Sequence, residues 1–151
     1  GAKRSSKKCK WASRFQRVVL AVGEMSEHQI QSAYFKWADL QISTKRFPGL
    51  DLIHSVPNGG SRNKLEAVNL KRTGTRPGVP DVTLPVARGG FIGLAIEFKA
   101  LDGNPSKEQR ERMNRMQQEG WCVTLCWDWQ AAARMTLGYL GMAKLEFGGG
   151  E

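Results

Sequence analysis

The sequence predicts an α/β domain built on a mixed four-stranded sheet that is flanked by helices. Amphipathic helical patterns, each with a start or stop signal, lie at residues 26–41, 106–120 and 128–140. Apolar runs rich in strand-forming residues lie at 50–56, 82–86, 91–98 and 121–127. The order along the chain is therefore α-β-β-β-α-β-α. Because a helix separates the third strand from the fourth, we expect these two strands to be parallel.

Capping patterns predict where the helices begin. Ser26 with Gln29, and Ser106 with Gln109, have the spacing of a capping box. Asp128 precedes the last helix as an N-cap. The first helix is amphipathic, with its apolar residues at Ile30, Ala33, Tyr34, Trp37 and Leu40.

The middle of the chain predicts a β-hairpin that brings two carboxylates together. A register centred on Gly89 places Asp81 directly opposite Glu97, with Cβ atoms roughly 4.5–5.5 Å apart. Lys99 shares the face of Glu97, because strand side chains alternate with period two. Two carboxylates this close repel each other unless a cation or a proton lies between them, and oxygen ligands suit Mg²⁺ or Mn²⁺. The hairpin therefore predicts a hydrolytic metal site, in which the lysine orients a water or stabilises a developing negative charge.

A second interpretation of the same residues is structural. Asp81 would then cap a turn, and Glu97 and Lys99 would be ordinary charges on an exposed strand face. The flanking sequence favours the metal site, because Glu97 is the only charge between Phe91 and Phe98. Charges in such an apolar strand are rarely left without partners.

Length and composition indicate one soluble domain. The chain has 151 residues, of which 40% are hydrophobic and 25% charged. It contains no apolar run of transmembrane length and no signal-peptide pattern. Two of the three cysteines, Cys122 and Cys126, fall in an apolar strand and are interpreted as reduced core residues. With only two histidines in the chain, a zinc site has little support.

The net charge of +9 is spread unevenly. Residues 1–24 carry +6, which indicates a basic extension. A second basic cluster is opposed only by Glu66 and consists of Arg62, Lys64, Lys71, Arg72 and Arg76. Basic clusters favour nucleic acid as a partner, although a basic extension can also serve only for solubility.

Two further segments frame the predicted site. Residues 61–72, which carry the second basic cluster except Arg76, are expected to form a short helix. The glycine-punctuated loop 73–80 leads into Asp81, and such loops can bring backbone close to a phosphate. Glu27 and Gln31 lie on or near the buried stripe of the first helix. For Glu27 the alternative is an acid in the first turn that favours the helix dipole.

These motifs together resemble the PD-(D/E)XK nuclease superfamily, and within it the VRR-NUC (virus-type replication-repair nuclease) domain. The resemblance spans about residues 26–127. Each of its stretches appears in order and with compatible spacing: Glu27-His28-Gln29-Ile30-Gln31, Val56-Pro57-Asn58-Gly59-Gly60, Gly78-Val79-Pro80-Asp81, Ile96-Glu97-Phe98-Lys99 and Ser106-Lys107-Glu108-Gln109.

The resemblance implies a restriction-endonuclease-like αβββαβ core and a role for each matching residue. Asp81, Glu97 and Lys99 match the catalytic residues. Metal ligands are implied to be Glu27, Asp81, Glu97 and the backbone carbonyl of Phe98. Residues implied to support the site or contact DNA are Gln31 and Gln109, together with the basic cluster Arg62, Lys64, Lys71, Arg72 and Arg76.

The resemblance further implies an Mg²⁺- or Mn²⁺-dependent endonuclease of branched DNA such as four-way (Holliday) junctions, with a place in DNA repair. It would be a stand-alone homodimer of the phage or bacterial type, in the cytoplasm of a bacterial or phage-infected cell, without organic cofactor or membrane partner. The expected divisions are a basic extension at 1–24, a nuclease domain at 25–145 and a tail at 146–151. Alternatives are a restriction- or Vsr-type nuclease, a non-catalytic nucleic-acid-binding module and an RNA-associated basic protein.

Overall fold

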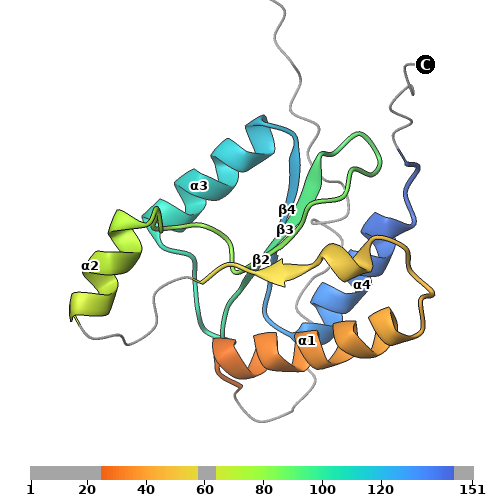
Figure 1. The fold of residues 1–151 in the computed structure, drawn as a ribbon, viewed down its shortest axis with the longest axis horizontal. Helices are drawn as coiled ribbons and strands as arrows, with labels where there is room; N and C mark the ends of the chain where they lie inside the picture. Colours follow the sequence, from red (N-terminus) through yellow and green to blue (C-terminus); the bar gives the residue numbers. More distant parts are fainter. Residues whose placement is uncertain (1–24, 58–63, 145–151) are drawn as a thin grey trace, which may run out of the picture.

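The computed structural model describes residues 25–57 and 64–144. Within them the chain forms an α/β fold with a mixed four-stranded sheet, as predicted (Figure 1). The expected basic extension, Arg62, the side chain of Lys64 and the expected tail at 146–151 lie outside the described residues. None of the helices in these two ranges is long and apolar enough to cross a membrane.

The sheet has the strand order β1-β2-β3-β4. The strands β1 (His54–Ser55), β2 (Val82–Leu84) and β3 (Gly93–Phe98) pair antiparallel, and β4 (Trp121–Cys126) pairs parallel to β3, as the crossover predicts. The helices are α1 (Glu27–Ser43), α2 (Lys64–Arg72), α3 (Lys107–Gln118) and α4 (Trp129–Leu140). In Figure 1, α1 and α4 lie together on one side of the sheet and α3 lies on the other, whereas α2 stands at the edge.

The predicted helix caps are present. Ser26 and Ser106 each accept a hydrogen bond from the backbone N–H three residues later, and each capping box is complete. The Asp128 carboxylate accepts a hydrogen bond from the Ala131 N–H at 2.6 Å. The cap of α3 matters most for the site, because its third residue, Gln109, points toward the sheet.

The core joins α1 and α4 to the sheet. Tyr34 of α1 is fully buried, with its ring centroid 5.5 Å from that of Phe98 and its hydroxyl 2.7 Å from the Thr136 hydroxyl. Cys122 and Cys126 are free and buried, which confirms their interpretation as reduced core residues. The predicted apolar stripe of α1 is wrong at Leu40, which is exposed.

The predicted strand at 50–56 is wrong over most of its length. A short 3₁₀ helix, η1 (Leu50–Leu52), replaces its first half, and only His54–Ser55 form a strand. The cause is the spacing of the apolar residues, because Leu50 and Ile53 are buried and three residues apart, which a helical turn satisfies and a strand does not. The predicted strand at 82–86 also ends early, at Leu84, because Pro85 has no N–H for the ladder.

The predicted register of the hairpin is confirmed. Val82 pairs with Ile96 and Leu84 pairs with Leu94, so Asp81 and Glu97 occupy the next opposed positions. Gly89 and Gly90 form the turn with φ of +57° and +86°, where glycine is favoured. At the tip of the hairpin, Arg88 pairs with Phe91. Between this pair and the Leu84–Leu94 pair, the β2 side contains one residue more than the β3 side, because Pro85 interrupts the ladder.

Candidate active site

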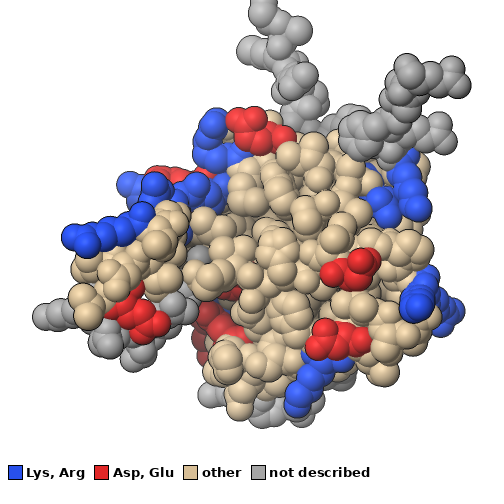
Figure 2. Space-filling view, in the orientation of Figure 1, with Lys and Arg blue, Asp and Glu red and all other residues tan. Residues whose placement is uncertain are grey.

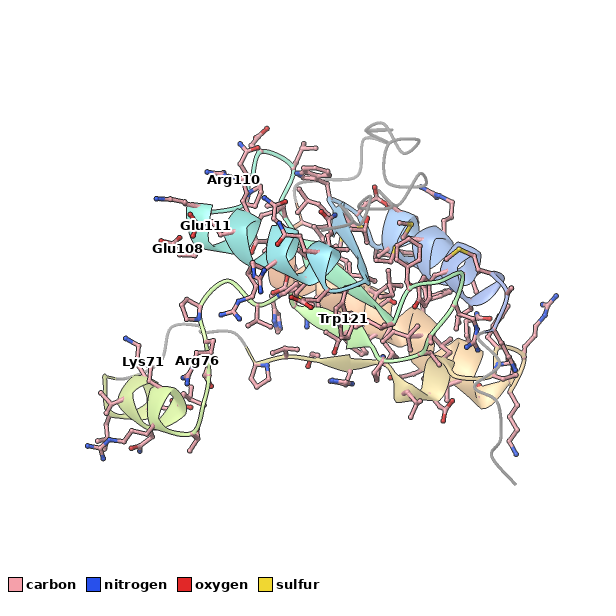
Figure 3. All side chains as sticks on the ribbon, turned by 90° about the horizontal axis from the view of Figure 1, so that it is seen from above. Lys71, Arg76, Glu108, Arg110, Glu111 and Trp121 are labelled. Carbon is pink, nitrogen blue, oxygen red and sulfur yellow. The ribbon has the colours of Figure 1, made fainter. Side chains whose placement is uncertain are left out.

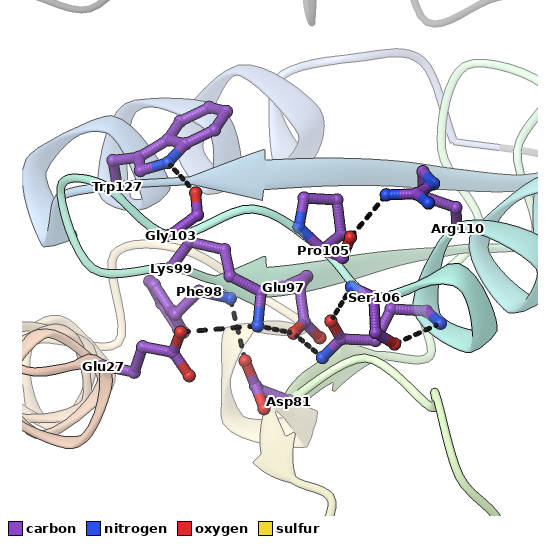
Figure 4. Close-up of polar contacts among 11 residues, drawn as sticks. Glu27, Asp81, Glu97, Phe98, Lys99, Gly103, Pro105, Ser106, Arg110 and Trp127 are labelled. Carbon is purple, nitrogen blue, oxygen red and sulfur yellow. Dashed lines mark hydrogen bonds and ion pairs between the residues drawn. The ribbon is translucent and has the colours of Figure 1, made fainter.

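The hairpin register brings Asp81 and Glu97 together at the edge of the sheet where β2 begins and β3 ends (Figure 4). The Asp81 Oδ2 atom accepts a hydrogen bond of 2.8 Å from the backbone N–H of Phe98, which fixes this carboxylate across the strands. Glu97 lies on β3 with a side chain that is only 1% exposed. Two carboxylates therefore share one largely buried end of the sheet.

The two oxygens of Glu97 have different surroundings. Its Oε1 atom accepts a hydrogen bond from Gln109 Nε2 at 2.5 Å and lies 3.1 Å from Lys99 Nζ. Its Oε2 atom is buried and has no hydrogen-bond partner among the described residues. A buried carboxylate oxygen without a donor is costly unless a proton or a cation satisfies it.

The charge state of Glu97 reflects this environment. Burial is the largest effect and, with the nearby negative charge of Asp81, raises the pKa of Glu97 to about 7. The hydrogen bond and charge of Lys99 act in the opposite direction, but they do not cancel the effect of burial. The surroundings of Glu97 therefore favour the protonated carboxyl group over the bare carboxylate.

Lys99 lies on the same face as Glu97, as the strand alternation predicts. Its side chain is 8% exposed, and Nζ lies 3.1 Å from Glu97 Oε1 and 3.4 Å from Glu27 Oε1. Burial alone would lower the pKa of Lys99, but the ion pairs with Glu97 and Glu27 outweigh burial and raise it. The ammonium group is therefore held charged between two carboxylates.

Glu27 reaches the site from the first turn of α1, where an acid also favours the helix dipole. Its side chain is half exposed, so this carboxylate lies at the rim while Glu97 lies at the base. Gln31, one turn further along α1, is partly buried. Glu27 is therefore both an acid in the first turn of α1 and a residue at the rim of the site, because one position satisfies both interpretations.

Gln109 connects helix α3 to the site through both ends of its amide. Its Oε1 atom accepts the Ser106 N–H at 2.8 Å in the capping box, while its Nε2 atom donates to Glu97. The start of α3 is thereby fixed relative to β3. A glutamine suits this place because one amide accepts and donates at the same time.

One contact beside the site is not predictable from the sequence patterns. The indole Nε1 of Trp127 donates to the Gly103 carbonyl at 3.1 Å, which holds the loop after Lys99 (Figure 4). Within the turn itself, a Cβ on Gly103 would lie 3.1 Å from the Ala100 carbonyl oxygen, so this position is tightly packed. The Trp127 bond joins segments that are distant along the chain, and the only local signal was the turn sequence around Gly103.

A second glycine fixes the loop that leads into Asp81. Gly78 has a φ of +75°, and a Cβ there would lie 2.5 Å from the Glu108 carbonyl oxygen on α3. Arg112 Nη2 donates to the Pro77 carbonyl in the same loop at 3.5 Å. The loop therefore packs directly on α3, three residues before Asp81.

The donor set fits a hard divalent cation. Among residues 25–57 and 64–144, no three His, Cys, Asp or Glu side chains are grouped so as to hold a metal by themselves. Asp81 and Glu97 offer two carboxylates, and Mg²⁺ is commonly held by one or two carboxylates together with waters. The buried Oε2 of Glu97, which no described residue bonds, and the raised pKa of Glu97 both indicate a place where a cation would be stabilised.

The predicted basic residues lie apart from the carboxylates. Lys71 and Arg72 are exposed on α2, and Arg76 is exposed on the loop that follows. Figure 3 shows Lys71 and Arg76 on this projecting part of the molecule. The bonds that hold Asp81, Glu97 and Lys99 come instead from β3, α1 and α3.

Comparison with known proteins agrees with the fold. The family model of the VRR-NUC domain matches residues 24–127. A solved structure described as "VRR_NUC domain protein" is 25% identical, with a TM-score of 0.64, over 80% of this chain and 93% of the other. Comparison with curated proteins gave no match. The chain therefore belongs to the VRR-NUC domain family, which places it among nucleases of the PD-(D/E)XK type.

Proposed function

We propose that this protein is a divalent-metal-dependent endonuclease that hydrolyses phosphodiester bonds in branched DNA. The observation that supports this most is the buried Glu97 carboxylate. It lies opposite Asp81, is bonded to Lys99 and Gln109, and keeps one buried oxygen without a donor among the described residues. A protein that needed these residues only for stability would gain little from two opposed carboxylates at one end of its sheet.

Asp81, Glu97 and the backbone carbonyl of Phe98 would hold the cation, with Glu27 at the rim. When bound, Mg²⁺ or Mn²⁺ neutralises charge on the scissile phosphate and makes a nearby water more acidic. The Phe98 N–H fixes Asp81 and the Gln109 amide fixes Glu97, so both carboxylates are oriented before any ligand arrives. Such preorganisation lowers the reorganisation that the reaction requires.

Lys99 would act on the reacting phosphate. Its ion pairs keep the ammonium charged, and its limited exposure strengthens any interaction with a developing negative charge. Glu27 and Glu97 hold Nζ from two sides, which limits the positions it can occupy. In this role Lys99 orients the attacking water or stabilises the transition state.

The preferred substrate would be a branched structure such as a four-way junction, cut by a homodimer during DNA repair in a bacterial or phage-infected cell. The described residues of one chain form one such site, and symmetric incision of a junction requires two sites related by a two-fold axis. Static light scattering measures the assembly directly. We expect the mass of a dimer, whereas a monomer that nicks one strand would favour a flap or nicking activity.

The substrate panel that tests the proposal consists of linear duplex, flap, splayed-arm and four-way junction DNA of equal strand length. Each is incubated with Mg²⁺, with Mn²⁺ and with a chelator. We expect cleavage with either metal, none with the chelator, and the highest rate on the junction. Equal cleavage in the chelator would contradict the metal dependence, and equal rates on all substrates would contradict the preference for branched DNA.

A further inference from the structure

Helix α2 stands apart from the rest of the described molecule. It makes no extensive packing contact with any other described helix or strand, and Figures 1 and 3 show it projecting from the edge where β2 begins. A helix of nine residues is only marginally stable in water by itself. A projecting helix this short therefore requires either local support or a partner.

Local support comes from the C-terminal end of α2. The Thr73 hydroxyl donates to the Asn69 and Leu70 carbonyls at 3.1 Å each, and the Thr75 N–H donates to the Leu70 carbonyl at 2.9 Å. Beyond this cap, the loop is fixed on α3 through Gly78. The helix is thus attached at a defined point, a few residues before Asp81.

One face of α2 combines apolar and basic residues. Leu65, Val68 and Arg72 are spaced at i, i+3 and i+7, so they share one side of the helix. Leu65 is 71% exposed and Val68 is 46% exposed. Lys71 lies next to this side, whereas Glu66 lies on the opposite side by helical geometry. We name this surface, formed by Leu65, Val68, Lys71 and Arg72, the α2 face.

We propose that the α2 face holds nucleic acid at the active site, with Lys71 and Arg72 on phosphates and Leu65 and Val68 against sugars and unstacked bases. This inference rests on the nuclease function proposed above. The charge of the segment favours this occupant. Residues 64–76 contain four basic residues and one acid, a net charge of +3. Figure 2 shows Lys and Arg along α2 and near the start of α3, where acidic side chains also lie.

A second copy of the chain fits the α2 face less well. Two such faces packed together would bring Lys71 and Arg72 of both copies close to one another, which like charges disfavour. Two apolar side chains also cover far less than the roughly 800 Å² per partner of a stable interface. Apolar side chains flanked by basic ones are, in contrast, a known means of contacting distorted DNA, where they insert between base steps.

The test measures DNA binding separately from cleavage, by fluorescence anisotropy of the full chain in a chelating buffer. The probes are a labelled four-way junction and a linear duplex of equal strand length. The charge variant is Lys71→Gln/Arg72→Gln, and the apolar variant is Leu65→Ser/Val68→Ser. The matched control is Lys36→Gln/Lys144→Gln, which removes the same net charge at exposed positions outside α2.

The two arms of the experiment have different expected signatures. The charge variant should bind both probes more weakly and flatten the slope of log affinity against log salt by about 2, since each phosphate contact contributes about 0.9. The apolar variant should bind the junction about tenfold more weakly, with an unchanged salt slope. The control should keep the wild-type slope, and exposed substitutions should leave the melting temperature nearly unchanged.

Several results would overturn the inference. Charge and apolar variants that bind both probes like the wild type would show that α2 does not contact DNA. A loss of dimer mass in the apolar variant, without loss of DNA binding, would assign the α2 face to a second copy. In both cases a wild type that still binds and cuts DNA leaves the nuclease proposal standing. A wild type that neither binds nor cuts DNA would remove that proposal, and this inference with it.

Discussion

Replacement of Glu97 by glutamine should change how the stability of the metal-free protein depends on pH. Burial and the charge of Asp81 raise the pKa of Glu97 from 4.5 to about 7. The folded state therefore binds this proton more tightly than the unfolded state does. The stability that Glu97 contributes is complete below about pH 4.5 and is lost as the pH rises through about 7.

The magnitude follows from the two pKa values. Each pKa unit corresponds to about 1.4 kcal/mol, so the free energy of unfolding should fall by on the order of 3 kcal/mol from this one group. For a domain of this size 1 kcal/mol corresponds to roughly 2–4 °C in melting temperature. The melting temperature of the wild type should therefore fall by roughly 6–12 °C relative to Glu97→Gln between about pH 4 and pH 8.

The assay is a series of calorimetric or fluorimetric melts in chelating buffer across this pH range. The control is Glu111→Gln, because Glu111 is an exposed acid on α3 that forms a surface ion pair with Lys107. Its curve should run parallel to the wild type. Added Mg²⁺ at about pH 8 should raise the melting temperature of the wild type and leave that of Glu97→Gln nearly unchanged.

Parallel wild-type and Glu97→Gln curves across the whole range would refute this reasoning. They would mean that Glu97 is ionised in the folded protein without cost, for example because water reaches Oε2. An increase in the melting temperature of both proteins with Mg²⁺ would place the cation elsewhere.

Three further predictions concern Lys99, the Gly78 loop and the basic extension. Lys99→Ala should slow single-turnover cleavage by about 10²–10³ while DNA affinity changes little; a rate reduction below tenfold with a large drop in affinity would make Lys99 a binding residue. Gly78→Ala should lower the melting temperature more than Gly74→Ala does. Both glycines have positive φ, where an alanine costs about 1–2 kcal/mol, but only at Gly78 would the new Cβ also clash, with Glu108. Equal decreases would show that the loop moves freely off α3. Deletion of residues 1–24 should weaken DNA binding and flatten its salt dependence, by about 0.9 in slope for each phosphate that the extension neutralises; an unchanged slope would show that the extension does not touch DNA.

The parts of the fold that were predictable from sequence are those fixed by local rules. The hairpin register beside the site was predictable because it is centred on Gly89, although the tip itself pairs Arg88 with Phe91 and one extra residue on the β2 side separates the two registers. The capping boxes at Ser26 and Ser106 were predictable for the same reason, since every atom involved lies within three residues. The hairpin alone placed Asp81 opposite Glu97, and the capping box at Ser106 placed Gln109 in the first turn of α3.

The errors arose where two local rules compete or where distant segments meet. Leu50 and Ile53 belong to an apolar run with the composition of a strand. Both side chains are buried, however, and their spacing of three residues favoured a helical turn. The contact of Gly78 with α3 and the Trp127 bond to Gly103 depend on tertiary packing, which no local pattern encodes. The projection of α2 was equally unpredictable, because the sequence predicts a short helix at 61–72 without indicating what it packs against.

The central claim is that Asp81 and Glu97 form a metal-dependent centre for DNA hydrolysis. Single-turnover cleavage of a four-way junction in Mg²⁺ by the wild type and by Asp81→Asn tests it most directly. The control is Asp51→Asn, which alters an exposed aspartate on η1. We expect cleavage by the wild type and the control, and no cleavage by Asp81→Asn, although it should fold and bind the junction with near wild-type affinity. Cleavage by Asp81→Asn at the wild-type rate would contradict the account.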